Sequence, residues 1–325
     1  MKITIAEIAR QAEVSKGTVS RVINGKSTVA EDTRRKVVEV MDRLGYEPDP
    51  VARELSMRTK FTLGIWVGAG ENRLSPYFNL VWRALLREMQ NRATQFVELP
   101  EDLSGVNRHL DAVLLFHSYE ITQRLAALAA SRIPAVLIGN YPGVACVGPD
   151  DIEGGRIAGR KLVEMGHRNL LHLTTGEDIQ WARERGLGFT EALERSGCPG
   201  LRWEVVRGAA SVLGGYRLMH QAWQDGHRPT GVFCGTDEMA IGALGALEDL
   251  GVEVPGQVSV VGFDGLAELC PGLASVAQDI PGIAHQAVSL ALAMIHEQHT
   301  RQTVVPVRFV SGATLGHAPR PGAHP

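Results

Sequence analysis

A run of cationic and hydroxyl side chains near the N-terminus offers the clearest chemistry in this chain. Between Val14 and Ala30 there are three cations, Lys16, Arg21 and Lys26, and no anion. Lysine and arginine can bond the acceptor atoms of guanine in the major groove, while serine and threonine hydroxyls can reach bases or phosphates. This stretch therefore predicts a surface that binds a polyanion.

The net charge of the chain supports that prediction only when residues 1–60 are counted separately from the rest. The net charge is −3, but residues 1–60 hold 12 Lys and Arg against 9 Asp and Glu, a net of +3. The other residues hold 21 against 27, a net of −6. A small basic module on a larger acidic body binds a polyanion at one end and repels it elsewhere.

Metal, disulfide and cofactor sites are not expected. Cys146, Cys198, Cys234 and Cys270 are 52, 36 and 36 residues apart, with no CxxC pair or His/Cys cluster. The segment 68–73, GAGENR, begins like a dinucleotide-binding GxGxxG but lacks the third glycine, and no GxxxxGK(S/T) or GxSxG motif occurs. We therefore expect no enzyme, no cofactor and no metal.

Length and composition predict a globular chain of about two domains. Hydrophobic residues make up 44% and charged residues 21%, which is ordinary for a folded protein. No apolar run reaches the roughly 18 residues of a membrane span. The N-terminal MKITIAEIARQAEV is interrupted by charges, unlike a signal peptide, so we expect a cytoplasmic protein without membrane contact.

Three short helices are predicted to position the basic stretch. Thr4 to Glu7 form a capping box before the first helix, and Ser15 is a good N-cap for a second helix over Lys16–Ile23. Asn24-Gly25 ends that helix, and a third runs from about Glu31 to Leu44. Two of the helices are joined by a tight turn, which suggests a helix-turn-helix unit.

The rest of the chain reads as an alternating α/β body. Pro48 and Pro50 forbid a regular helix in the junction 45–60. Apolar runs then alternate with helical stretches, which implies doubly wound parallel sheets with ligands at the carboxyl ends of strands. The predicted strands are Thr62–Val67, Ala112–Phe116, Ala135–Ile138, Leu170–Leu173, Gly231–Cys234 and Val258–Gly262. The predicted helices include Tyr77–Arg92, Gly154–Met165, Glu184–Ser196 and Met239–Gly251.

An ordered set of short motifs resembles the lactose-repressor/galactose-repressor (LacI/GalR) family of bacterial transcription regulators. The motifs span nearly the whole chain: TIAEIA at 4–9, VSKGTVSRVING at 14–25, LGYEP at 44–48, VAREL at 51–55, MGHR at 165–168, RGLGF at 185–189, TDEMA at 236–240 and VVGFD at 260–264. Each motif alone is weak, whereas the ordered set is specific.

The resemblance implies a domain organisation. It implies a helix-turn-helix domain at 1–46, a hinge at 47–60, an effector-binding domain at 61–315 and a flexible tail at 316–325. The effector-binding domain resembles a type I periplasmic binding protein, with an N-subdomain of 61–149 and 279–315 and a C-subdomain of 150–278. The tail is rich in Pro, Gly and His and has no leucine heptad, so no tetramerising coiled coil is expected.

For DNA binding, the second helix can turn Val19, Val22 and Ile23 to its core and expose the opposite face. The alternative without DNA binding is a solvated basic face on an ordinary three-helix bundle. The resemblance implies that Lys16, Gly17 and Arg21 read bases and that Thr4, Ser15, Thr18, Ser20 and Asn24 complete the DNA contacts.

In the hinge, Leu55 matches a residue that enters the minor groove, with Ala52 beside it. The alternative is a leucine that packs against the next domain. Three departures from the family pattern stand out: Asp49 places an anion near a phosphate, Pro50 stiffens the entry to the hinge, and Glu13 occupies a turn that usually has glycine.

For the effector, the resemblance places Arg185 and Asp264 at a cleft, with Thr236 and Asp237 at the tip of another strand. A guanidinium and a carboxylate suit adjacent hydroxyls, because one donates and the other accepts; a purely structural pair is the alternative. Further candidates are Arg183, Phe78 and Trp181, the last being either a platform for a sugar face or a core residue.

Departures from the family leave the effector open. Thr236 replaces a frequent Asn, Gly139 a carboxylate and Ile280 an aromatic residue, and Gln95 to Leu110 is short for a strand and a full helix. We expect a polyhydroxylated effector such as a sugar, with a purine or another ligand as the alternative. A homodimer on two-fold operator DNA is implied, and a solute-binding protein or an α/β enzyme is the rival class.

Overall fold

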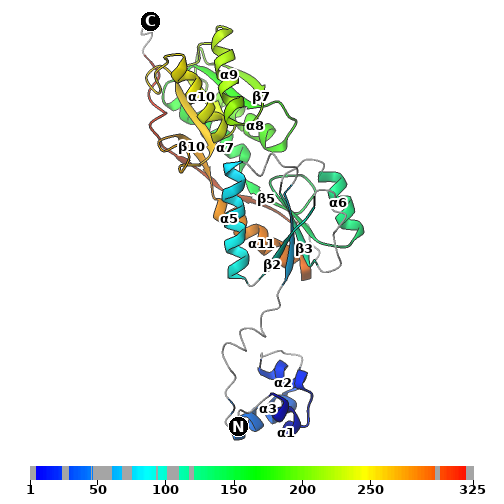
Figure 1. Ribbon diagram of the computed structural model, residues 1–325. Helices are drawn as coiled ribbons and strands as arrows, with labels where there is room; N and C mark the ends of the chain where they lie inside the picture. Colours follow the sequence, from blue (N-terminus) through cyan, green and yellow to red (C-terminus); the bar gives the residue numbers. More distant parts are fainter. Residues whose placement is uncertain are drawn as a thin grey trace. The chain divides into compact units, whose positions relative to one another are not determined.

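The computed structural model describes residues 5–23, 29–44, 46, 61–67, 75–92, 94–100, 110–116, 121–296 and 301–319. The chain forms two compact units, residues 1–61 and residues 62–325 (Figure 1). Each unit has its own hydrophobic core and is described separately.

The first unit contains the three predicted helices around a small core. Its helices are α1 (Ile5–Ala12), α2 (Lys16–Ile23) and α3 (Glu31–Leu44). One apolar face of each helix packs inward, as the helical spacing predicts. The buried side chains are Ile8, Ala9, Ala12, Val19, Val22, Val37 and Val40. The predicted helix-turn-helix is therefore confirmed.

The turn between α1 and α2 has the strain that its sequence predicts. Glu13 has φ 53°, in the left-handed region where a residue with a Cβ is disfavoured. Its carboxylate accepts a hydrogen bond from Lys36 Nζ at 2.8 Å on α3, so the side chain helps to hold the turn. The Glu7 carboxylate accepts from Gln11 at 3.0 Å, but Thr4 lies outside the described residues and the capping box stays a prediction.

The second unit is built on two six-stranded sheets. The first has the order β11-β5-β4-β3-β1-β2 and the second the order β12-β10-β9-β8-β6-β7. All of the described strand pairs are parallel except β10 with β12. The strands of the first sheet are β1 (Thr62–Trp66), β2 (Gln95–Glu98), β3 (Ala112–Phe116), β4 (Ala135–Ile138), β5 (Cys146–Pro149) and β11 (Gln302–Val305). Those of the second are β6 (Asn169–Thr175), β7 (Arg202–Gly208), β8 (Gly231–Cys234), β9 (Ser259–Asp264), β10 (Ala274–Gln278) and β12 (Val307–Val310).

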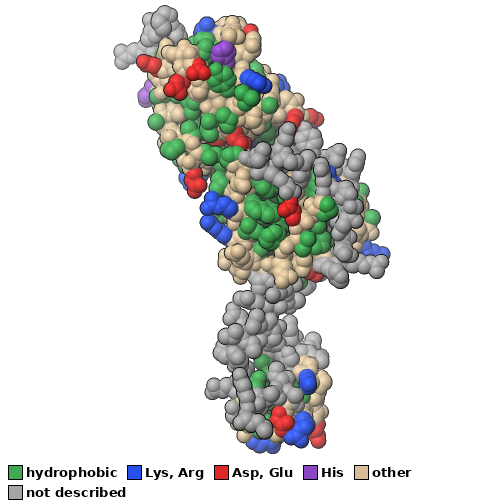
Figure 2. Space-filling view, viewed as in Figure 1, with side chains coloured by type: hydrophobic (Ala, Val, Ile, Leu, Met, Phe, Trp, Pro, Cys, Tyr) green, Lys and Arg blue, Asp and Glu red, His purple; other side chains and the backbone are tan. Residues whose placement is uncertain are grey.

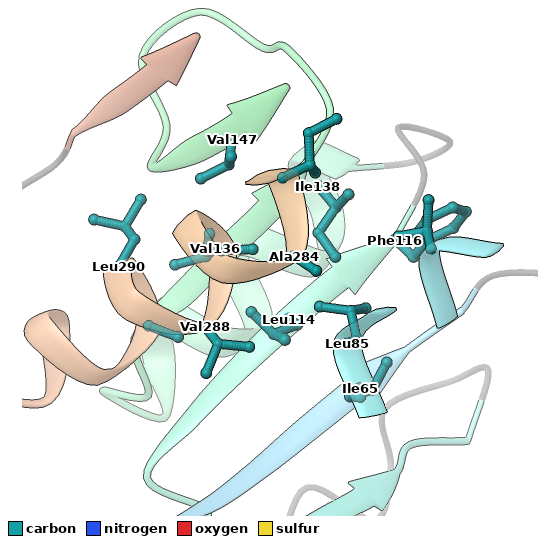
Figure 3. Close-up of a cluster of buried hydrophobic side chains, with 14 of the residues drawn as sticks. Ile65, Leu85, Leu114, Phe116, Val136, Ile138, Val147, Ala284, Val288 and Leu290 are labelled. Atoms are coloured by element: carbon teal, nitrogen blue, oxygen red, sulfur yellow. The ribbon is translucent and has the colours of Figure 1, made fainter. Parts of the chain in front are cut away.

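Helices cover both faces of each sheet. In the N-subdomain, which holds the first sheet, α5 (Pro76–Asn91) and α11 (Ile280–His296) share one core with β1, β3, β4 and β5, and α6 (Ile121–Ala130) packs on the opposite face. Figure 3 shows Ala284 and Val288 of α11 facing Leu114 and Val136 of the strands. In the C-subdomain, α7 (Asp151–Glu164) and α8 (Gln180–Arg195) lie on one face, and α9 (Val212–Gln224) and α10 (Asp237–Asp249) on the other.

The predicted boundary near the C-terminus of the effector-binding domain is wrong. The resemblance predicts that residues 279–315 belong to the N-subdomain, but β12 pairs antiparallel with β10, with Val310 opposite Ser275 in the C-subdomain sheet. The chain returns to the C-subdomain at Pro306, one residue after β11 ends. Two consecutive short strands look alike in sequence, and only their partners show which sheet each one joins.

The predicted flexible tail is also ordered at its start. The Gly316 carbonyl accepts hydrogen bonds from His167 Nε2 at 3.1 Å and from the Ser259 hydroxyl at 3.3 Å. The Ala318 amide donates to the Met165 carbonyl at 2.8 Å. Residues 316–318 therefore belong to the C-subdomain, and residues 320–325 lie outside the described part of the chain.

None of the described helices is long and apolar enough to cross a membrane. Within the same residues, no group of three or more His, Cys, Asp or Glu side chains is arranged to hold a metal ion, and the four cysteines are free.

The bonds of the C-terminal segment yield a test. A chain that ends after Leu315 should have a lower Tm than the full chain, because the fully buried His167 side chain loses its acceptor. An unsatisfied buried polar group costs about 1–3 kcal/mol. A chain that ends after Pro319 keeps these bonds and should melt like the full chain in differential scanning calorimetry. Equal melting of the two truncated chains would show that residues 316–318 contribute nothing.

Candidate DNA and effector sites

The exposed face of α2 matches the predicted DNA-contacting surface where it is described. Ser15, Lys16 and Gly17 are exposed, whereas Val19 is buried. The Ser15 hydroxyl caps the helix, accepting from the Thr18 amide at 3.0 Å and lying 2.9 Å from the Thr18 hydroxyl. The first turn of α2 has no acidic residue, so the partial positive charge of the helix N-terminus is not offset. This end of α2 can therefore receive a phosphate.

The other DNA-binding predictions are not tested by the structure. The backbone of Ser20 and Arg21 lies in α2, but their side chains are not described. Thr4, Asn24, Ala52 and Leu55 lie outside the described residues. Their assignments stay predictions.

The second candidate site is a buried ion cluster around Arg185 on α8. Its Nε donates to Asp151 Oδ1 at 2.8 Å, and its Nη1 donates to the Gly235 carbonyl at 2.6 Å and approaches Asp264 Oδ1 at 3.4 Å. Only 5% of Arg185 is exposed. Asp151 begins α7, Gly235 follows β8 and Asp264 ends β9, so the carboxyl edge of the sheet assembles the cluster.

The cluster extends at both ends into the N-subdomain. On one side Gln278, at the end of β10, donates to Asp264 Oδ1 at 2.8 Å and accepts from the Tyr77 hydroxyl of α5 at 2.8 Å. On the other side Asn140, which follows β4, donates to Asp151 Oδ2 at 3.0 Å. An unbroken chain of polar contacts thus runs from one subdomain through the other and back.

Burial controls the protonation of these carboxyls. It raises the pKa of Asp264 to about 8, although the Arg185 guanidinium opposes the shift and Asp237 adds to it. Burial likewise raises the pKa of Asp151 to about 6, again against the pull of Arg185, and it raises the pKa of Asp237. The Arg185 guanidinium also lies 3.5 Å from the centroid of the Phe263 ring. Such a contact favours the charged guanidinium.

Arg185 still has capacity to bind a ligand. Of its nitrogens, Nε and Nη1 are used, and no described residue accepts a hydrogen bond from Nη2. Asp264 Oδ2 has one long contact, 3.4 Å from the Asp237 amide. The Trp181 ring lies 4.7 Å from the Arg185 guanidinium. The site therefore offers a donor, an acceptor and an aromatic ring close together, which suits the hydroxyls of a sugar.

The structure brings together three of the predicted effector residues, Arg185, Asp264 and Trp181. Arg183, two residues away on α8, is exposed and pairs with Asp178 at 2.6 Å, so it is not part of the cluster. Phe78 is buried and packs edge-to-face on Phe116 at 4.9 Å between centroids. Arg183 faces solvent and Phe78 packs in the core of the N-subdomain, so neither bonds to the Arg185 cluster in this structure, and their effector contacts stay predictions.

The two predicted residues at the tip of β8 have structural contacts. The Thr236 hydroxyl caps α10 by accepting from the Met239 amide at 3.2 Å. Asp237 accepts from the Ser275 hydroxyl at 2.7 Å and from the Leu266 amide at 2.6 Å. Both carboxylate oxygens of Asp237 are thus used within the protein, so we reassign it from ligand contact to positioning the loop after β9.

Sequence reasoning missed Asp151, Asn140, Gln278 and Tyr77. Asp151 lies two residues after an apolar run and Gln278 ends another, which is a signal for the carboxyl edge of a sheet. Tyr77 bonds to the cluster whereas its neighbour Phe78 packs on Phe116, and the sequence does not show which of two adjacent aromatic residues faces the core. Asn140 had no signal beyond its place after a strand.

Comparison with known proteins gives consistent relatives over both units. Residues 4–49 match the family described as bacterial regulatory proteins, lacI family, and residues 160–315 match the periplasmic binding protein-like domain. The HTH-type transcriptional regulator GalR of Escherichia coli (strain K12) is 32% identical, over 90% of this chain and 89% of the relative. The HTH-type transcriptional repressor PurR of Yersinia pestis (strain Antiqua) is 30% identical, over 93% of each. A solved complex of the transcriptional regulator CelR with cellobiose is 27% identical with a TM-score of 0.69, over 96% of this chain and 100% of that one.

Removing the central cation should destabilise the second unit severely. In Arg185→Met the carboxyls of Asp151 and Asp264 stay buried without their counter-ion, and breaking a buried pair in this way costs about 3–5 kcal/mol. Arg183→Met, on the same helix but exposed, should change the free energy of unfolding by less than about 0.5 kcal/mol. Urea denaturation followed by circular dichroism measures both. A similar small effect for the two variants would contradict the buried cluster.

The raised pKa of Asp264 predicts a dependence of stability on pH. Because the folded state holds this proton up to about pH 8 and the unfolded state releases it near 3.8, folding stability falls as the pH rises between those values. From pH 7 to 8 this group should lower the free energy of unfolding by about 1 kcal/mol, partly offset by the last protons that histidines lose in the unfolded state. Asp264→Asn should remove this slope and Asp178→Asn should keep it, as measured by urea denaturation at each pH. A flat profile in the unmodified protein would contradict the shift.

Proposed function

The chain belongs to the LacI family of DNA-binding bacterial transcription regulators, and on that premise we propose that it is a repressor controlled by a sugar or sugar derivative. The effector binds at the cluster of Arg185, Asp264 and Trp181. The observation that carries this proposal is the buried Arg185–Asp264 pair, which has an open donor and an open acceptor within a contact chain that joins the two subdomains.

The chemistry of the cluster favours hydroxyl groups. Arg185 Nη2 donates, and Asp264 Oδ2 donates when it is protonated or accepts when it is ionised, so two adjacent hydroxyls satisfy both, and Trp181 offers a ring against the apolar face of a sugar. The structural relative solved with cellobiose supports a sugar, since that ligand is a disaccharide and the likeness covers this unit. A purine is the alternative effector, and a DNA-binding titration with both classes of ligand distinguishes it from a sugar.

Control of DNA binding follows from the contacts between subdomains. Tyr77 to Gln278 and Asn140 to Asp151 join the two subdomains through residues that touch the effector-binding cluster. A ligand that binds one arrangement of the subdomains more tightly than another shifts the population between them. The sign of the effect, induction or corepression, is decided by which arrangement the DNA-bound protein adopts.

A homodimer is the proposed DNA-binding form. One helix-turn-helix unit reads a half-site, so a two-fold operator needs two copies. On the N-subdomain, the edge strand β2 exposes Phe96 (42%) and Val97 (47%), and Trp82 of α5 packs edge-to-face on Phe96 at 5.7 Å. Hydrophobic side chains gather over the same subdomain in Figure 2. We propose that a second copy covers this face.

The direct test of the effector is a DNA-binding titration. Fluorescence anisotropy of the full chain with DNA from upstream of its own coding sequence is repeated with a panel of hexoses, hexosamines, disaccharides and purine nucleosides. At least one sugar should change the affinity for DNA about tenfold or more, a coupling of 1.4 kcal/mol. A response to purines alone would overturn the sugar assignment, and no response to any ligand would overturn control by this site.

DNA contact through α2 is tested with a charge-matched pair of variants. Lys16→Ala should weaken operator binding roughly 5- to 150-fold, because a base contact contributes about 1–3 kcal/mol. Lys36→Ala removes the same charge from α3, where the side chain pairs with Glu13, and should weaken binding far less. Competition with substituted operators separates the roles of Lys16: loss at one base pair identifies a base contact, and uniform loss identifies a phosphate contact. Equal binding by Lys16→Ala and the unmodified protein would contradict the assigned surface.

A further inference from the structure

The Arg185 cluster contains many more acidic than basic groups. Three carboxyls are buried, Asp151, Asp237 and Asp264. Glu184 and Glu238 are half-buried beside them: Asn140 Nδ2 lies within 3.1 Å of both Glu184 and Asp151, and the charge of Glu238 acts on Asp264. Arg185 is the only Lys or Arg among the buried residues that the structure describes.

Neighbouring features do not restore the balance. The N-termini of α7 and α10 meet the cluster, and each contributes roughly half a positive charge. That partial charge offsets about one of the five carboxyls, and Arg185 offsets another. Arg183, the nearest cation on α8, is paired with Asp178 in solvent. The segments after β1 and β3, residues 68–74 and 117–120, are not described, but their sequences contain Glu71, Arg73 and Glu120 and so bring no net positive charge.

Buried hydrogen-bond acceptors at the same edge of the sheet also lack donors. Thr174, at the end of β6, is 4% exposed, and its hydroxyl has no hydrogen-bond partner among the described residues. It lies beside Gly235, whose carbonyl binds Arg185: a Cβ added at Gly235 would be 3.3 Å from the Thr174 hydroxyl and 3.4 Å from the Trp181 ring. The Thr174 hydroxyl and the Trp181 ring therefore both border Gly235, the residue whose carbonyl binds the guanidinium.

His172 adds a second acceptor on the same face of β6. Its Nδ1 lies 3.1 Å from the Phe233 carbonyl and so carries the proton, which leaves Nε2 as an acceptor. Nε2 is buried without a partner among the described residues and lies against Gly186, the neighbour of Arg185 on α8. Buried acceptors without donors are costly, and a ligand that brings donors removes that cost.

We propose that the effector carries a protonated amine on a polyhydroxylated framework, as a hexosamine does, with the ammonium beside Asp264 Oδ2 and Thr174 and the hydroxyls on Arg185 Nη2. This inference rests on the proposed function, because it concerns the ligand of the same site. An ammonium group supplies both the missing positive charge and three hydrogen-bond donors, whereas a hydroxyl supplies one donor and no charge.

Without an amine, a proton bound to a carboxylate reduces the negative charge of the cluster. With its pKa raised by burial to about 8, Asp264 holds a proton at neutral pH in the absence of another cation. An arriving ammonium replaces that positive charge, so Asp264 ionises and its proton leaves to the buffer. Binding of an amine should therefore release a proton, whereas binding of a neutral sugar should not.

Isothermal titration calorimetry of the full chain tests the proposal with matched pairs: glucosamine and glucose, galactosamine and galactose, mannosamine and mannose. At pH 7, at least one amine should bind about tenfold or more tightly than its neutral partner, a difference of 1.4 kcal/mol. Its binding enthalpy should change between phosphate and imidazole buffers, which differ in ionisation enthalpy and carry no hydroxyl groups of the ligand's kind. Equal binding within every pair, or no binding of any amine at millimolar concentration, would overturn the proposal.

Three variants locate the charge that the amine recognises. Asp264→Asn should remove the preference for the amine and the release of the proton. Glu238→Gln, at a half-buried position that tolerates substitution more easily, should reduce the preference several-fold. Asp178→Asn removes an exposed carboxylate just before α8, the helix that carries Arg185, and should leave the preference for the amine unchanged. An unchanged preference in Asp264→Asn and Glu238→Gln would overturn the proposal.

The DNA-binding titration keeps this inference separate from the proposed function. If a neutral hexose alone changes the affinity for DNA, the sugar-controlled repressor stands and the amine assignment fails. If an amine binds by calorimetry but no ligand changes the affinity for DNA, the amine assignment stands and control of DNA binding by this site fails.

Discussion

A buried guanidinium between two carboxyls is the interaction on which the second unit depends. Arg185 is removed from water, which is tolerable only because Asp151 and Asp264 approach it and the Gly235 carbonyl takes a third bond. Each partner comes from the carboxyl end of a different strand or the start of a different helix. The pairing of β6, β8, β9 and β10 is therefore what creates the site, and the site in turn ties their ends together.

The same interaction gives the cluster its connection to the rest of the molecule. Asp264 reaches Tyr77 through Gln278, and Asp151 reaches Asn140, so each carboxyl joins the guanidinium to a different part of the N-subdomain. A further contact, from the Ser75 hydroxyl to Glu238 at 3.2 Å, joins the two subdomains beside this series of polar contacts. Because hydrogen bonds have narrow geometric limits, a ligand that displaces one member must change the others. This is the physical basis for coupling the site to the arrangement of the subdomains.

Neighbouring residues of similar type are the positions whose surroundings the sequence does not distinguish. Arg185 and Asp264 are predicted by the resemblance to the LacI/GalR family, and the structure brings the two side chains together in a buried pair. Arg183 was chosen beside Arg185, and Phe78 beside Tyr77, yet one member of each pair faces away from the cluster. The rotation of a helix about its axis separates these neighbours, and packing against the rest of the fold sets that rotation. The sequence does not show that Ser275 of β10 and Leu266 after β9 donate to Asp237, because these donors are 38 and 29 residues away along the chain.

Local pattern alone determined the three helices of the first unit, the strained turn at Glu13, the alternating α/β order and six of the strands, because propensity, capping and periodicity act over a few residues. Tertiary structure decided the strands β2, β5, β7, β10, β11 and β12, the return of the chain at Pro306 and the docking of residues 316–318. It also decided the membership of the Arg185 cluster, whose partners are 34 and 79 residues away. Contacts at such separations depend on which strands pair, and short apolar strands of similar composition do not specify their partners until the whole sheet packs.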